Sequence, residues 1–160
     1  MKKLLPLIFG TLLAGAAFAQ TPDTPTFVNT AASSDMYEIR SSEMALQMSQ
    51  TEGVKTFAQQ IIADHTKASQ ELVQAAAPDM VPAAEMLPKH QQMLAELQAA
   101  GTANFDAVYA QQQQAAHTEA VALFQGYAQA GEDPEVKAFA EKTLPVLQMH
   151  LDHAKSLPSS

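Results

Sequence analysis

Apolar residues recur along most of the chain at the three- and four-residue spacing of a helix that buries one face, and nothing after the first 25 residues shows the alternation typical of a strand. One such stripe consists of Val54, Ala58, Ile61, His65, Ala68 and Leu72, which follow one another at this spacing. The pattern therefore predicts an all-α protein. Four long helices, and one short helix between the second and third of them, are expected at about residues 26–50, 52–77, 88–99, 103–130 and 134–157.

The connections between these helices predict how they pack. Thr51 is an N-cap candidate for the second helix. The tripeptide at 133–135, Asp-Pro-Glu, combines a cap, a proline suited to the first turn and an acid near the positive end of the helix dipole. VKTFAQQII (54–62) resembles VKAFAEKTL (136–144), and each follows a tight connection, so two antiparallel hairpins are expected.

Residues 78–101 contain three prolines and end in a glycine, and they form the long connection between the two hairpins. A helix of the predicted length measures about 39 Å, a distance that this partly helical segment can travel. Two hairpins joined by such a crossover, which carries a short extra helix, are the layout of a ferritin-like four-helix bundle.

The first 19 residues, MKKLLPLIFGTLLAGAAFA, have the parts of a secretory signal peptide in the right order: a positive start, an apolar stretch and a small-x-small cleavage site. The apolar run is short for a membrane span. We expect cleavage after Ala19 and a periplasmic or secreted mature protein with no membrane span. The remaining chain divides into a flexible lead at 20–25, the bundle at 26–157 and a tail at 158–160.

Composition narrows the chemistry. The chain has no cysteine, which excludes disulfides, thiolate metal sites and a cysteine nucleophile. Its net charge is -8, and loss of Lys2 and Lys3 with the signal peptide takes it to -10. Arg40 is the only arginine. Because nucleic-acid binding relies on clustered lysine and arginine, a nucleic-acid partner is not expected.

Four polar residues fall on otherwise apolar helix faces, where burial without a partner is costly. They are Glu38, His65, His117 and His150, one from each long helix. Glu38 and His65 are equally far from the first tight connection, at about 20 Å, and His117 and His150 are equally far from the second, at about 25 Å. In a bundle with these connections at opposite ends, all four side chains converge near mid-height.

One glutamate and three histidines are a credible ligand set for a single Zn, Mn or Fe ion. Asp35 and Asp64 are close enough along the sequence to act as outer acceptors that fix an imidazole tautomer. The alternative is a polar core network without a metal, in a binding or stress-protective module. A hydrolase or oxidase at the same site would require an open coordination position and a cleft. His90 and His153 are expected at the surface.

The stretches FVNTAASSDMYEI, VKTFAQQIIADHTKA, FDAVYAQQQQAAHTEAVALF and VKAFAEKTLPVLQMHLDHA resemble the secreted bacterial family catalogued as domain of unknown function 4142. The resemblance covers about residues 27–157 and implies a ferritin-like fold, without implying an activity. Diiron ferritins carry Glu-x-x-His on two helices. Here Ile62 and Leu147 stand three residues before His65 and His150, so a dinuclear centre is not expected.

Overall fold

The computed structural model describes residues 21–158 except 79, 81 and 83. It confirms the predicted all-α class, with no strand among the described residues. The signal peptide predicted at 1–19 lies outside the described part of the chain. Five helices follow one another: α1 (Thr24–Met48), α2 (Glu52–Ala75), α3 (Pro88–Ala99), α4 (Gly101–Ala130) and α5 (Pro134–Ala154).

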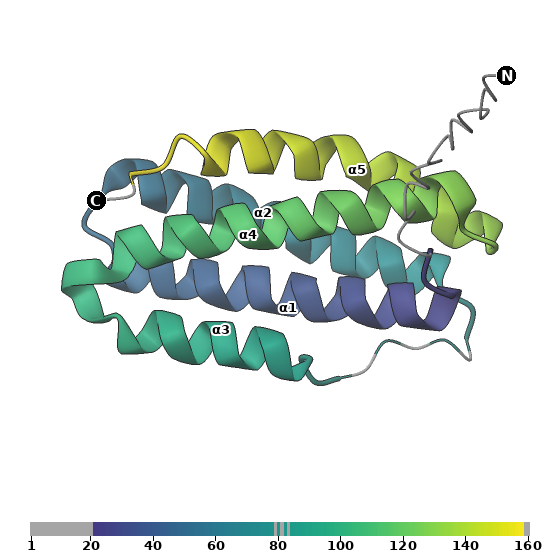
Figure 1. Ribbon diagram of the computed structural model, residues 1–160, viewed down its shortest axis with the longest axis horizontal. Coiled ribbons are helices and arrows are strands. Elements are labelled where there is room, and N and C mark those ends of the chain that lie inside the picture. The colour runs from purple at the N-terminus through teal and green to yellow at the C-terminus, as the bar shows by residue number, and fades with distance from the viewer. Residues whose placement is uncertain (1–20, 79, 81, 83, 159–160) are drawn as a thin grey trace, which may run out of the picture.

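The helices form a bundle of two antiparallel hairpins (Figure 1). α1 packs on α2 and α4 packs on α5, while the contacts α1–α4 and α2–α5 join the hairpins. The α1–α2 and α4–α5 connections lie at opposite ends of the bundle (Figure 1). The segment after α2 returns along the bundle and carries α3, which lies against α1 and α4. The predicted crossover with a short helix is therefore present.

Helix ends differ from the predicted ones by a few residues. α1 begins at Thr24, inside the expected lead, because the Asp23 side chain accepts a hydrogen bond from the backbone N–H of Thr26 and Pro25 fits the first turn. Thr51 occupies the predicted N-cap position of α2, but its side chain makes no capping hydrogen bond, and its hydroxyl donates to Asp106. Gly101 begins α4 with φ of 63°, a left-handed conformation that permits the reversal from α3.

Two apolar clusters fill the bundle, one toward each end. The first contains Phe27, Leu72, Phe124 and Leu147, and the second contains Val54, Phe57, Ile61, Phe105 and Tyr109. Glu38 and the three histidines from the apolar faces fall between these clusters in sequence and are almost completely buried. The bundle therefore has a polar layer across its middle.

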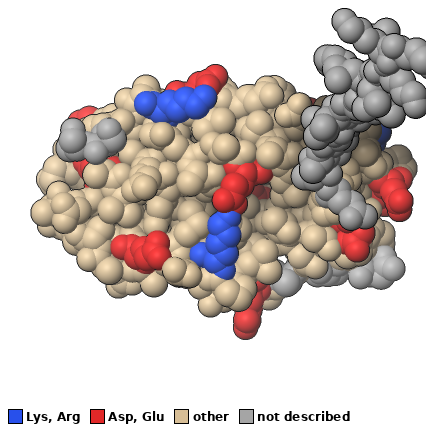
Figure 2. Space-filling model, in the orientation of Figure 1, with Lys and Arg blue, Asp and Glu red and all other residues tan. Residues whose placement is uncertain are grey.

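Among the described residues, no helix combines the length and apolar character that a membrane crossing requires. On the face shown in Figure 2, lysine and arginine side chains are few and lie well apart.

Candidate metal centre

The imidazoles of His65, His117 and His150 lie together in the polar layer. Their ring centroids are separated by 5.6 Å (His65–His117), 5.5 Å (His65–His150) and 5.4 Å (His117–His150). One nitrogen from each ring lies within 4.8 Å of the other two. The rings come from α2, α4 and α5, and each is at most 3% exposed. This confirms the expected convergence of the three histidines.

Each imidazole is held in place through one of its two nitrogens. Nδ1 of His65 is 2.8 Å from Oδ1 of Asp35 on α1, and Nε2 of His150 is 2.9 Å from Oδ2 of Asp64 on α2. Nδ1 of His117 donates to the backbone carbonyl of Gln113, one turn earlier, over 3.0 Å. These acceptors fix the position of a proton on each ring and therefore the tautomer.

The other nitrogen of each ring is buried and has no hydrogen-bond partner in the described structure. These atoms are Nε2 of His65, Nε2 of His117 and Nδ1 of His150. Leaving a buried polar atom unpaired costs about 1–3 kcal/mol. Three such atoms from three neighbouring rings could share one partner, which would remove this cost for all of them.

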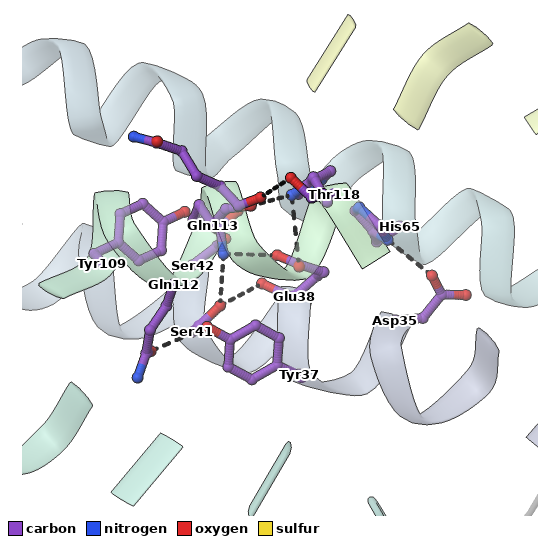
Figure 3. A network of polar contacts seen from close by, with 12 residues as sticks. Asp35, Tyr37, Glu38, Ser41, Ser42, His65, Tyr109, Gln112, Gln113 and Thr118 are labelled. Atoms are coloured by element: carbon purple, nitrogen blue, oxygen red, sulfur yellow. Dashed lines mark hydrogen bonds and ion pairs between the residues drawn. The ribbon is translucent and has the colours of Figure 1, made fainter. Parts of the chain in front are cut away.

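Glu38 is buried beside this group rather than within it. Its Oε2 accepts a hydrogen bond from Nε2 of Gln113 at 2.7 Å (Figure 3). Its Oε1 lies 3.7 Å from Nδ1 of His117. The set of mutually close ligand atoms contains the three imidazoles and not this carboxylate. Figure 3 also shows the His65–Asp35 contact at the edge of the same network.

Burial dominates the electrostatics of the layer. It raises the pKa of Glu38 to about 7, against the opposing effects of His65 and the Gln113 hydrogen bond. Burial, followed by the charges of His65 and His150, lowers the pKa of His117 to about 3. The pKa of His150 is also lowered by burial, although Asp64 opposes this. His117 is therefore neutral at physiological pH, the form that can coordinate a metal.

His65 differs from the other two histidines. Burial lowers its pKa, but the hydrogen bond and charge of Asp35, with the charges of Glu38 and Asp64, outweigh that effect and raise the pKa overall. Of the three rings, His65 holds a proton most readily. An incoming cation must therefore compete with a proton at this residue.

Two features of the site region were not predicted from sequence. Gln113 bridges Glu38 and His117, and its place one turn before His117 on the same face was a usable signal. His90 was expected at the surface, and this prediction is wrong: it is 7% exposed. Its Nδ1 lies 2.6 Å from Oγ of Ser33, and its ring stacks on Tyr37, because α3 turns this face toward α1.

The fold and the site together define a small helical bundle with a buried three-histidine cluster that could hold a metal ion. The chain belongs to the family described as Domain of unknown function (DUF4142), whose model matches residues 11–157. Searches of the curated proteins and of the solved structures found no match.

Proposed function

We propose that this protein binds a single divalent metal ion through His65, His117 and His150. The observation that carries the proposal is the presence of three buried, unpartnered imidazole nitrogens on rings whose other nitrogens are all held. An ion about 2.0–2.1 Å from each nitrogen needs them about 3.4 Å apart. One nitrogen from each ring already lies within 4.8 Å of the other two, so the nitrogens need to approach by at most about 1.4 Å.

The donor chemistry favours zinc among the three candidate ions. Imidazole suits Zn and Fe, whereas Mn prefers oxygen ligands, and nitrogen sites generally bind Zn more tightly than Fe or Mn. Glu38 as a fourth ligand stays a prediction, because its carboxylate must turn from Gln113 past His117 to reach the ion.

The proposal extends to fold type and location. The opposite placement of the two hairpin connections and the crossover with α3 support a ferritin-like arrangement (Figure 1). The charged, apolar and small-residue parts of the N-terminal sequence support export and cleavage after Ala19. On this basis the protein binds its metal in the periplasm or outside the cell.

Burial argues against a reaction at the site. Glu38 and His117 are each 1% exposed, and the other two histidines are at most 3% exposed. A hydrolase or oxidase needs an open coordination position that substrate can reach. We therefore propose binding of the ion itself rather than turnover of a bound substrate.

Metal titration of tag-free protein, after stripping with a chelator, tests the proposal. We expect one Zn²⁺ per chain in the wild type. His117→Gln should weaken binding by more than about tenfold, since loss of even an outer partner of a ligand weakens binding by that amount. His90→Gln is the matched control: it also removes a buried histidine, but one outside the cluster. It should retain wild-type affinity.

The result that would overturn the proposal is a wild-type protein that takes up no Zn, Mn or Fe above background while keeping its helical circular dichroism. The cluster would then be a structural polar network. Equal loss of affinity in His117→Gln and His90→Gln would place the bound ion elsewhere. Mass analysis of the bound metal distinguishes these outcomes from non-specific uptake by surface carboxylates.

A further inference from the structure

The three groups that hold the imidazoles differ in their access to solvent. The Asp35 side chain is 8% exposed, and Gln113 is 0% exposed. The Asp64 side chain is 36% exposed, although its Oδ2 is bonded to the almost fully buried ring of His150. Asp64 therefore touches both the solvent and a residue of the cluster, whereas the other two groups are enclosed.

Asp64 also borders a hollow on the surface between α2 and α5. Ala68, Thr143 and Val146 form part of its lining, together with the ion pair between Glu71 and Lys142. His150 links Asp64 to the cluster: its Nε2 lies 2.9 Å from Oδ2 of Asp64, and its Nδ1 is one of the unpartnered nitrogens. One imidazole ring, held by one hydrogen bond, therefore connects the partly exposed Asp64 carboxylate to the cluster.

We propose that Asp64 is the entry residue of the metal centre: it captures the hydrated cation at the surface and admits it past His150. This inference rests on the proposed function. Cation binding by the Asp64 carboxylate competes with the hydrogen bond to Nε2 of His150. The released ring can then turn and let the ion move from the carboxylate to the imidazole nitrogens, after which the hydrogen bond closes again.

The charges around the hollow predict how entry responds to mutation. Asp64 attracts a cation, while Lys142 and the exposed Lys67 repel it, and Glu71 partly compensates Lys142 through their 2.8 Å contact. Charges that line a narrow approach change association rates more than affinities. Removing the attractive charge should therefore slow association, and removing a repulsive charge should speed it.

Stopped-flow absorption with Co²⁺ as the probe measures association and dissociation separately. Asp64→Asn removes the charge but keeps an oxygen that can accept from His150. Asp35→Asn makes the same change at the enclosed partner of His65. We expect association to slow about tenfold or more in Asp64→Asn, in the range of electrostatic effects on such rates. In Asp35→Asn, association should stay within about twofold of the wild type while dissociation quickens.

A third variant tests the same route in the opposite direction. Lys142→Gln should speed association by about two- to threefold at low salt, and the gain should shrink as salt screens the remaining charges. This exposed residue is outside the core, so the variant should fold as the wild type does.

Three results would overturn the entry route. Equal slowing in Asp64→Asn and Asp35→Asn would show that only total charge matters. Unchanged association in Asp64→Asn would show that ions enter elsewhere. A rate that saturates at the same value in all variants would show that the bundle must open first. If wild-type protein binds no Co²⁺ or Zn²⁺ at all, the metal site itself fails, which is a distinguishable outcome.

Discussion

Glu38 and His117 lie side by side in the core, with Oε1 3.7 Å from Nδ1, yet burial moves their pKa values away from those of an ion pair. The pKa of Glu38 rises from 4.5 to about 7, and that of His117 falls from 6.5 to about 3. Both groups are then predominantly neutral in mildly acidic solution. Glu38→Gln tests this directly, because glutamine is always neutral and its side-chain oxygen can still accept from Gln113.

The sign and size of the effect follow from linkage. A carboxyl group whose pKa is raised on folding contributes stability that is present below pH 4.5 and is lost as the pH rises through about 7. This loss corresponds to roughly 3 kcal/mol and is absent in Glu38→Gln. The free energy of unfolding of the variant, relative to that of the wild type, should therefore rise by roughly 3 kcal/mol as the pH increases from 4.5 to above 7.

His117 acts in the opposite direction. A histidine whose pKa is depressed contributes stability that is present above pH 6.5 and is lost as the pH falls through about 3. In the wild type this loss and the gain from Glu38 offset each other between pH 4.5 and 6.5, so the contribution of the pair to stability is flat there. In Glu38→Gln the offset disappears, and stability should decline steadily as the pH falls through this range.

Urea unfolding of the metal-free protein in chelator, followed by circular dichroism at several pH values, measures both profiles. Glu43→Gln removes an exposed carboxylate from the same helix and controls for net charge. A pH-independent difference between the wild type and Glu38→Gln would refute the neutral carboxyl group. A variant that instead loses stability toward neutral pH would indicate an ionised Glu38 paired with a protonated imidazole.

Three further predictions address the scaffold and the ligands. Gly131→Ala should destabilise the protein by about 1–3 kcal/mol, since the added Cβ would lie 2.5 Å from the Tyr127 ring. The Cβ added in Gly126→Ala meets no atom within 4 Å, so this variant should stabilise α4 by about 0.5–1 kcal/mol. Urea unfolding of both variants checks this. Ser33→Ala should lower the free energy of unfolding by about 1–3 kcal/mol in the same assay, because the Ser33 hydroxyl joins α1 to His90 and to the backbone N–H of Leu87. Thr30→Ala is the control: it removes a hydroxyl that donates to Thr26 within the same helix, and it should change stability by less than about 0.5 kcal/mol. Zn²⁺ binding should release a proton from His65, whose pKa is raised, so affinity should fall as the pH drops, and calorimetry in buffers of different ionisation enthalpy should detect that proton.

The fold could be predicted largely from local signals in the sequence. The apolar stripes located the four long helices, and the Asp133 cap marked the start of α5, where its side chain accepts hydrogen bonds from the backbone N–H groups of Glu135 and Val136. Helix ends were less predictable, because a cap depends on what its side chain touches. The hydroxyl of Thr51 donates to Asp106, which lies on another helix. The residues next to Thr51 in the sequence do not identify that partner.

The level of the site could also be predicted, because residue counts from a tight turn translate directly into height along a helix. Residue counts do not give the rotation of each helix about its own axis. That rotation decides which of the side chains at one level face one another. The three imidazoles converge, whereas Glu38 accepts a hydrogen bond from Gln113. Predicting that partner would require the orientation of α1 relative to α4. The partners of the histidines cross helices in the same way: Asp64 adjoins His65 in sequence but bonds to His150.

X-ray absorption at the zinc edge of protein loaded with one equivalent of Zn²⁺ tests the three-histidine site most directly. The arrangement of His65, His117 and His150 predicts three imidazole nitrogens about 2.0 Å from the metal, with the outer-shell scattering of their rings. A shell made of oxygen alone, or scattering from fewer than three imidazoles, would contradict it.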